Sequence, residues 1–286
     1  MKKLLKVILF SLSFIVAATV FAIMYLYRIT NPIVSASPNL SSPNYFIAHA
    51  SGSLCGYVYL NSKESLVNSL DNGYQYIEVD LDYTSDSVLV CVHDWEDFNK
   101  ASIPGISWRD SALFLSVPTL KEFKQRKIYG KFTSLTLEDV INIKQDHPFT
   151  LVTDRISNPI ALNRYLKKEQ RHSIMVEAFS EQDYRILKAD GYIPMLSLKL
   201  VKFSDCLFFA MNHLSEKNID WIVVDYHSSF RGLRLLKRLL GIKIAAYTVN
   251  HPSLFIDHLD KEFDLVYTDN WNLKTQINNF QNHTTR

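Results

Sequence analysis

Short runs of β-branched, aliphatic or aromatic residues alternate with longer amphipathic stretches through most of the chain. The short runs have the length and composition of strands, and the apolar positions of the longer stretches recur at helical spacing. The predicted strands are 46–50, 76–82, 88–93, 150–154, 173–179, 193–198, 221–225, 243–249 and 264–268. The predicted helices are 62–72, 137–145, 160–169, 181–189, 206–217, 230–240 and 253–259.

This alternation is typical of an α/β fold with a parallel sheet, in which each crossover needs about a dozen residues. One continuous series of this length fits a single TIM-type (β/α)8 barrel better than two domains, so we expect a barrel over residues 45–286. The segment 83–87 is too short for a parallel crossover, and we expect a hairpin or a bent strand there. Residues 95–132 are expected to form an insertion over one end of the barrel.

An uncharged apolar run extends from Val7 to Tyr27. As a helix rising about 1.5 Å per residue it is long enough to cross a hydrocarbon layer of about 30 Å. Because lysines precede it in residues 1–6, we expect a signal anchor over 7–27, a cytoplasmic N-terminus and a barrel on the extracytoplasmic side, periplasmic or extracellular. A cleaved signal peptide is the alternative. Residues 28–44 are rich in Pro, Ser and Asn and are expected to be a linker.

The distribution of charge along the chain argues against nucleic acid as a partner of the barrel. The whole chain has a formal net charge of +2, and every acidic residue lies at or after Glu64. The body that follows the basic N-terminal segment is therefore nearly neutral, and it lacks the basic surface that neutralises nucleic-acid phosphates. The three cysteines have no close spacing, which excludes a disulfide scaffold and matches no zinc pattern.

Polar residues lie at the ends of several predicted strands, where parallel barrels gather their chemistry. These residues are His49, Glu78, Asp80, His93, Asp154, Asp225 and Asp269. Glu78 and Asp80 are two positions apart on one strand, so their side chains leave the same face. Two adjacent carboxylates repel each other unless a cation or a shared proton compensates, and oxygen ligands suit Mg²⁺ or Ca²⁺. Asp154 is a candidate third ligand, and two histidines could transfer protons on opposite sides of a phosphate.

Five motifs in order resemble those of the glycerophosphodiester phosphodiesterase family across residues 45–270. They are Ile47-Ala-His, Asn61-Ser-Lys-Glu-Ser-Leu, Asn72-Gly-Tyr-Gln-Tyr-Ile-Glu-Val-Asp, Val90-Cys-Val-His-Asp, and Tyr247-Thr-Val-Asn with Tyr267-Thr-Asp. The resemblance implies a TIM-type barrel, a divalent cation and hydrolysis of glycerophosphodiesters to glycerol 3-phosphate and an alcohol. It also implies that His49 and His93 are the acid and base, and that Glu78 and Asp80 are metal ligands. Asp154 stands where the family commonly has a glutamate.

The chain departs from the family pattern at positions that contact phosphate. Ala50 stands where the family usually has an arginine, and Ile156 stands where a basic residue is expected. Arg155 or Lys199 could substitute. One alternative is a lipid phosphodiesterase of the phospholipase D or C type that forms a cyclic phosphate, because a missing arginine and an aspartate as third ligand also occur in that wider superfamily. A second alternative is a barrel that has lost catalysis and binds an envelope component.

Asn61 receives a structural interpretation. It precedes the predicted helix 62–72, and Glu64 follows three residues later. This spacing is typical of an N-cap box, in which the two side chains satisfy the first free amides of a helix.

Overall fold

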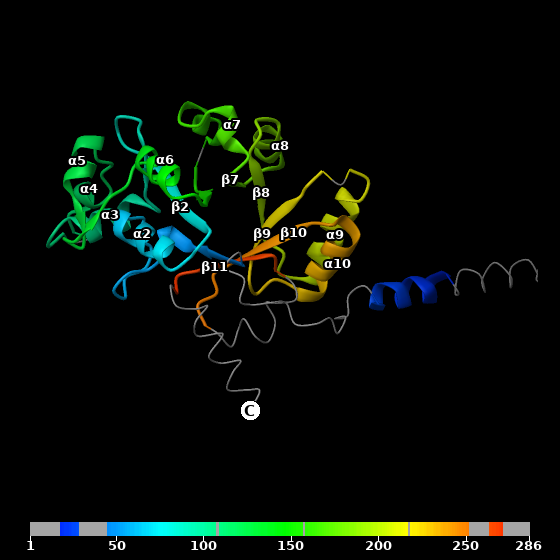
Figure 1. Ribbon diagram of the computed structural model, residues 1–286. Helices are drawn as coiled ribbons and strands as arrows, with labels where there is room; N and C mark the ends of the chain where they lie inside the picture. The colour runs from blue at the N-terminus through cyan, green and yellow to red at the C-terminus, as the bar shows by residue number, and fades with distance from the viewer. Residues whose placement is uncertain are drawn as a thin grey trace, which may run out of the picture.

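The barrel is a closed ring of parallel strands in the computed structural model, which describes residues 18–28, 45–106, 109–156, 158–216, 218–251 and 263–270. The ring contains β1 (Phe46–Ala48), β2 (Tyr76–Tyr83), β6 (Thr150–Asp154), β7 (Ile174–Ala178), β8 (Ile193–Leu198), β9 (Trp221–Asp225), β10 (Lys243–Tyr247) and β11 (Leu265–Thr268). Neighbouring strands pair in parallel, and β1 closes the ring by pairing with both β2 and β11 (Figure 1). The predicted TIM-type barrel is confirmed.

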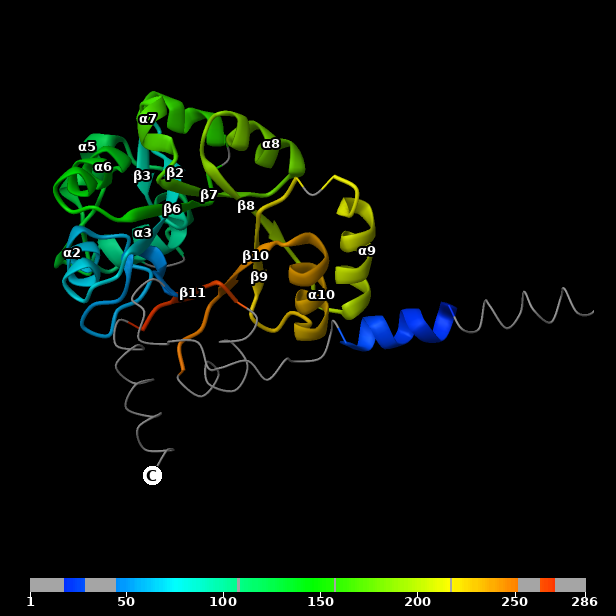
Figure 2. The same ribbon diagram turned by 45° about the vertical axis from the view of Figure 1, so that its right-hand side comes forward.

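Helices surround the ring, as the amphipathic stretches predicted (Figure 2). They are α2 (Lys63–Asp71), α6 (Leu137–Asp146), α8 (Glu181–Ala189), α9 (Phe203–His213) and α10 (Phe230–Leu240). The single helix predicted over 160–169 is wrong, because a 3-10 turn (Pro159–Arg164) and the short α7 (Lys168–Arg171) occupy it and the extended Lys167 separates them. The helix predicted over 253–259 lies outside the described residues.

Alternation along the strands produces two apolar layers. Side chains that point into the ring form a small inner cluster: Ile47, Val152, Met175, Met195, Val223, Ala245, Leu265 and Tyr267. Side chains that point outward belong to a larger cluster shared with the helices. Because each layer removes apolar surface from water at roughly 25 cal/mol per Å², the ring is fixed from both sides and its strand ends are held in position.

The segment that follows β2 turns back as a hairpin, as predicted. The strand β3 (Leu89–Cys91) is antiparallel to the end of β2, and the amide of Val92 donates to the carbonyl of Asp80 at 3.0 Å. The expectation that His93 ends a parallel barrel strand is therefore wrong. His93 returns to the barrel mouth from the opposite direction, because the hairpin reverses the chain.

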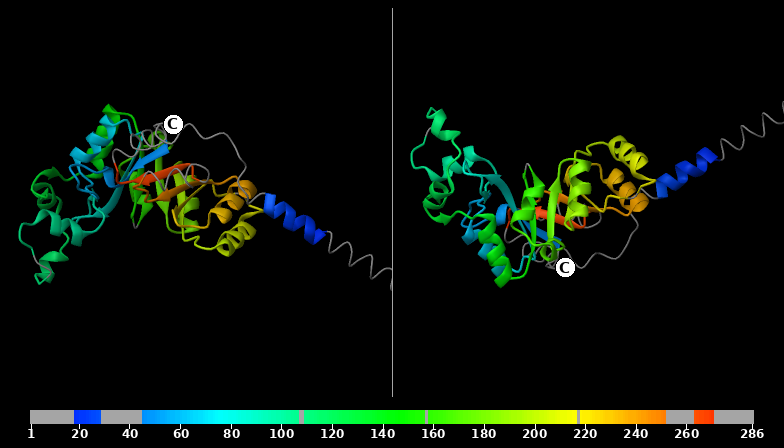
Figure 3. Two further views of the ribbon diagram at one scale, coloured as in Figure 1. Left: turned by 90° about the horizontal axis from the view of Figure 1, so that it is seen from below. Right: turned by 90° about the horizontal axis from the view of Figure 1, so that it is seen from above.

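Residues after His93 form a small body beside the barrel mouth. It contains α3 (Trp95–Ser102), α4 (Ser111–Phe114), α5 (Leu120–Gln125), β4 (Lys127–Ile128) and β5 (Phe132–Thr133). Its own apolar cluster includes Phe98, Phe123 and Phe132 and reaches β3 through Val90. Viewed along the vertical axis of Figure 1, this body projects from the side of the barrel opposite α9 and α10 (Figure 3).

The described part of the expected membrane span is helical over residues 18–28. Among the described residues, no helix combines the length and apolar character that crossing a membrane requires. The rest of the expected span, which begins at Val7, and the linker after residue 28 lie outside the described residues.

Candidate active site

All five predicted site residues line one cavity of about 260 Å³ at the carboxyl ends of the strands. They are His49, Glu78, Asp80, His93 and Asp154. The cavity is also lined by residues from further strands of the ring, among them Glu177 of β7, Ser197 of β8 and Tyr247 of β10. The barrel thus brings together residues that lie more than 100 positions apart in the sequence.

Three carboxylates meet on two neighbouring strands. Glu78 and Asp80 share one face of β2, and the parallel register places Asp154 of β6 directly opposite Asp80. One oxygen from each of the three residues lies within 4.8 Å of the others. Glu78 and Asp80 are each only 1% exposed, so this cluster concentrates negative charge away from water.

Burial and mutual repulsion shape the protonation of this cluster. Burial, followed by the charges of Asp80 and Asp154, raises the pKa of Glu78 well above its ordinary value. Burial and the Asp80 charge also raise the pKa of Asp154. The ionised cluster is therefore unfavourable by itself and is stabilised by added positive charge.

The unshared oxygens of this cluster fit a divalent cation. Glu78 Oε2 accepts the Ala50 amide at 2.5 Å, and Asp80 Oδ2 accepts Nδ2 of Asn61 at 2.8 Å. Neither Glu78 Oε1 nor Asp80 Oδ1 has a hydrogen-bond partner among the described residues, although both atoms are buried. Carboxylate oxygens of this kind are the ligands that Mg²⁺ and Ca²⁺ prefer.

Asn61 belongs to this site, so its interpretation as a helix cap is wrong. Ser62 caps α2 and forms the capping box with Ser65, whereas Glu64 accepts from Thr133. The Asn61 amide instead holds Asp80 from two directions, because its Oδ1 also accepts the Asp80 backbone amide at 3.2 Å. Its own backbone is left-handed, with φ of 43°.

Glu177 is a fourth acidic residue of the cavity that the sequence analysis missed. It lies on β7, only 5% exposed, and accepts a hydrogen bond from the Tyr267 hydroxyl at 2.7 Å. Burial and the charge of Asp154 raise its pKa well above the ordinary value. The available signal was a single carboxylate within the apolar run Ile-Met-Val-Glu-Ala.

Each histidine is oriented by a carboxylate at the same ring nitrogen. His49 Nδ1 donates to Asp269 Oδ1 at 2.7 Å, and His93 Nδ1 donates to Asp94 Oδ2 at 2.8 Å. With Nδ1 occupied, Nε2 is the nitrogen left for proton transfer in both residues, and in His93 it accepts from Arg155 Nη1 in this structure. The strand-end argument selected both Asp269 and Asp225. Asp269 contacts His49, whereas the exposed carboxylate of Asp225 pairs with His227 and takes no part in the site.

The ring of Tyr59 lies between the two histidines. Its centroid is 4.7 Å from that of His49 and 5.4 Å from that of His93, both at steep angles. Burial and the negative charges of Asp269 and Asp80 raise the pKa of Tyr59 to about 12. The hydroxyl therefore stays protonated at neutral pH and can act as a hydrogen-bond donor.

A basic residue reaches the site from a different position than the family pattern expects. Arg155 follows Asp154 directly, and its Nη1 donates to His93 Nε2 at 3.2 Å. Ala50, at the position where the family pattern has arginine, is fully buried with φ of 46°. Lys199 is exposed after β8 and is not among the residues that line the cavity.

The mouth of this closed parallel barrel combines acidic residues with two histidines that carboxylates orient. This combination suits the hydrolysis of phosphate esters. The fold is similar to that of a phosphodiesterase from Oleispira antarctica solved with the product sn-glycerol-3-phosphate. That protein has 18% identity and a TM-score of 0.59 over 83% of this chain and 96% of its own. A glycerophosphoryl diester phosphodiesterase from Parabacteroides distasonis has 17% identity and a TM-score of 0.61 over 86% and 93%.

A family model defines the relationship more closely. The model of the glycerophosphoryl diester phosphodiesterase family matches residues 54–198, half of the chain. The chain belongs to this family and is a phosphoric diester hydrolase.

The raised pKa of Glu78 predicts how stability of the metal-free protein depends on pH. In the unfolded chain Glu78 ionises near its ordinary pKa, and in the folded chain it holds its proton to higher pH. Its contribution to stability is therefore present below the unfolded pKa and is lost as pH rises. Each pKa unit corresponds to about 1.4 kcal/mol. With a chelator present, Glu78→Gln should unfold at higher urea concentration than wild type at about pH 8 and show a smaller difference at about pH 5.

The exposed Glu96→Gln on α3 is the matched control and should follow wild type at both pH values. A residual slope is expected in Glu78→Gln because Glu177 also has a raised pKa. If the stability of Glu78→Gln still falls with rising pH as steeply as that of wild type, Glu78 is not the group whose raised pKa causes the fall.

Proposed function

We propose that this protein hydrolyses glycerophosphodiesters to glycerol 3-phosphate and an alcohol with the help of a divalent cation. The observation that carries the proposal is a single cavity where three clustered carboxylates face two carboxylate-oriented histidines. Family membership and the fold shared with a phosphodiesterase solved with sn-glycerol-3-phosphate support this substrate class.

Glu78, Asp80 and Asp154 would hold the cation, which we propose to be Mg²⁺ or Ca²⁺. When bound, such an ion offsets the negative charge that grows on the phosphoryl oxygens. Asn61 and the Ala50 amide fix the two ligands of β2, so that their remaining oxygens converge. Removing the carboxylate charge at either β2 position leaves the fold with less repulsion but removes a ligand.

The two histidines would divide the proton transfers between them. Hydrolysis forms a bond from water oxygen to phosphorus and breaks the bond from phosphorus to the alcohol oxygen. In-line displacement puts these two oxygens on opposite sides of phosphorus, so one imidazole cannot readily serve both. One Nε2 accepts the proton of water and the other donates a proton to the departing alkoxide.

Arg155 would contact a non-bridging phosphate oxygen in place of the arginine that is missing at position 50. Its Nη1 lies 3.2 Å from His93 Nε2, so it is near the place where a phosphate must lie for His93 to exchange a proton with water or with the departing alkoxide. Hydrogen bonds from a charged donor contribute about 1.5–3 kcal/mol, enough to matter for binding and rate.

A barrel without catalysis is the rival function. The observation against it is that both histidines have orienting carboxylates, since a binding protein has no need for oriented proton-transfer groups. The experiments on metal and histidine variants below separate the two functions.

We also propose that the barrel is anchored to a membrane by residues 7–27 and lies on its extracytoplasmic side. The support is the uncharged apolar run behind the N-terminal lysines.

Metal binding is tested by titrating Mg²⁺ and Ca²⁺ into the chelated protein by calorimetry. Asp80→Asn and Glu78→Gln should bind at least about tenfold more weakly than wild type, because each loses a charged ligand. Asp154→Asn should behave in the same way. Asp82→Asn, on the same strand but outside the cavity, is the control. Unchanged affinity in both β2 variants would remove these residues from the site.

The histidine roles are tested by kinetics on glycerophosphodiesters. His49→Ala and His93→Ala should each lose about 10²–10⁴-fold in kcat while keeping the cation. Because both act in one transition state, the double variant should lose less than the product of the single losses. A nitrophenyl leaving group should rescue the variant that lacks the acid. Near wild-type turnover by either variant would refute the two-histidine mechanism.

The phosphate role of Arg155 is tested with Arg155→Gln, which should lose about 10–100-fold in kcat/KM. Lys199→Gln, the other basic candidate, should behave as wild type. If the losses occur in Lys199→Gln instead, the assignment of the phosphate contact is reversed.

Membrane topology is tested by fusing reporters after Asn44. A reporter that works only outside the cytoplasm should be active, because the preceding segment is expected to carry it across the membrane. Activity confined to a cytoplasmic reporter would end this proposal.

A further inference from the structure

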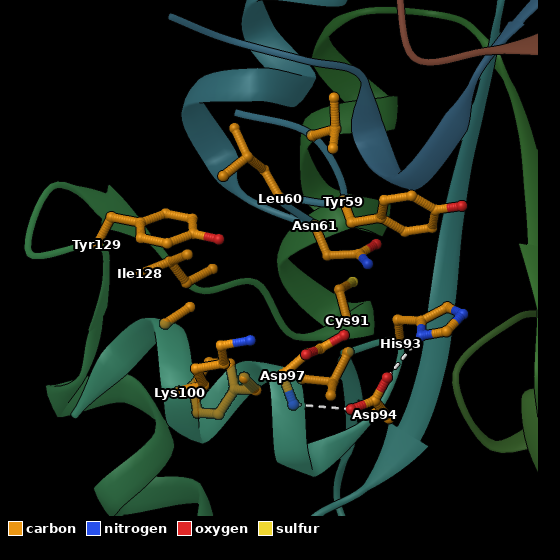
Figure 4. Close-up of a pocket in the computed structure, with 14 residues that line it drawn as sticks. Tyr59, Leu60, Asn61, Cys91, His93, Asp94, Asp97, Lys100, Ile128 and Tyr129 are labelled. Carbon is orange, nitrogen blue, oxygen red and sulfur yellow. Dashed lines mark hydrogen bonds and ion pairs between the residues drawn. The ribbon is translucent and has the colours of Figure 1, made fainter. Parts of the chain in front are cut away.

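A second pocket of about 330 Å³ adjoins the catalytic cavity. Tyr59 and His93 line both spaces, so the pocket begins at a catalytic imidazole. In Figure 4, His93 lies at one end of the pocket, while Tyr129 and Lys100 lie at the other. A group attached to a phosphate in the catalytic cavity therefore has a direct route into this pocket.

Three residues that line the pocket have an unusual backbone conformation. Tyr59, Asn61 and Tyr129 all have left-handed backbones, with φ of 55°, 43° and 52°. This conformation is unfavourable for most residues with a Cβ, less so for asparagine, and such strain gathers at ligand sites. The Tyr129 ring is also supported from behind by Tyr57, with ring centroids 4.4 Å apart. The fold therefore holds both tyrosine rings in place at the pocket wall.

The lining combines apolar faces with polar groups of both signs. Leu60, Phe98 and Ile128 form buried apolar walls. Asp97 and Lys100 reach the pocket from one turn of α3, and no ion-pair partner of either side chain occurs among the described residues. Asp94 is already engaged, because it accepts from His93 and from the Asp97 amide.

This lining discriminates among classes of alcohol. A cationic alcohol would meet the Lys100 ammonium, and an anionic one would meet the Asp97 carboxylate. A simple alkyl chain would gain no hydrogen bond from either charged group, both of which can otherwise be hydrated at the pocket rim. A ring with hydroxyl groups at its edge and C–H groups on its faces satisfies all of them, because the faces pack on tyrosine and the edge bonds to the charged groups.

We infer that this pocket holds the departing alcohol of the substrate, and that this alcohol is an uncharged polyhydroxylated ring, a sugar or a cyclitol. The inference rests on the proposed function, since it assumes a phosphodiester in the catalytic cavity. It also assigns the general acid. As water adds to phosphorus and His49 takes its proton, the phosphorus–oxygen bond to the ring breaks. His93, protonated at Nε2 once Arg155 has turned from it to the phosphate, gives that proton to the ring oxygen.

The first experiment compares kcat/KM of the full-length protein, with Mg²⁺ or Ca²⁺, on glycerophosphodiesters of inositol, choline and butanol. The inositol diester should exceed the other two by at least about tenfold, because only inositol has hydroxyls that can bond to both Asp97 and Lys100, whereas choline is repelled by Lys100 and butanol bonds to neither. A preference for the choline or the butyl diester would overturn the inference.

Variants then test whether the pocket causes this preference. Tyr129→Ser and Asp97→Ala should each lower the ratio of kcat/KM for the inositol diester to that for the butyl diester by about tenfold. Glu96→Ala, on the same helix outside the pocket, and Phe208→Ser, exposed on α9, are controls that should keep the ratio. Thermal unfolding checks that each variant is folded. An unmoved ratio in both pocket variants contradicts the assignment.

A wild-type protein that hydrolyses none of the diesters would contradict the proposed function and not the pocket. In that case the thermal shift caused by myo-inositol still tests the pocket. Stabilisation that Tyr129→Ser abolishes supports the inference, and no stabilisation of wild type contradicts it.

Discussion

The repulsion among buried carboxylates is the constraint around which the mouth of the barrel is organised. Glu78, Asp80 and Asp154 approach closely because parallel pairing of β2 and β6 fixes their register. Hydrogen bonds from the Ala50 amide and from Asn61 satisfy one oxygen each on the two buried ligands, and a divalent cation would compensate the rest. The left-handed backbones of Ala50 and Asn61 serve the same end, because they aim these donors at the carboxylates.

The hairpin after β2 links this acidic centre to a part of the protein outside the ring. It carries His93 back to the level of Asp80 and then leads directly into α3. One wall of the second pocket therefore comes from the segment that positions His93, a proposed catalytic residue. If the proposed alcohol pocket is correct, changes in the small body beside the barrel mouth would alter the accepted alcohol without moving the carboxylates of β2 and β6.

The proposed phosphate contact comes from a different position than the family pattern expects. Position 50 holds a fully buried alanine, whose amide donates to Glu78. Arg155 extends instead from the strand end that also supplies Asp154. The proposed metal ligand Asp154 and the proposed phosphate ligand Arg155 are thus consecutive residues, and the same turn orients both side chains.

The sequence by itself determined the barrel and most of its site. Strand and helix periods depend on local apolar patterning, and the short 83–87 segment excluded a parallel crossover, so these features were accessible without coordinates. His49, Glu78, Asp80 and Asp154 followed from the rule that parallel strands end at one rim. Only the tertiary structure decided which polar residues join them. Glu177 comes from β7, the neighbour of β6 in the ring. Asn61, which lies between β1 and α2, donates to Asp80, and Asp225 pairs with His227 instead. These outcomes depend on ring closure and side-chain direction, which residues close in sequence do not encode.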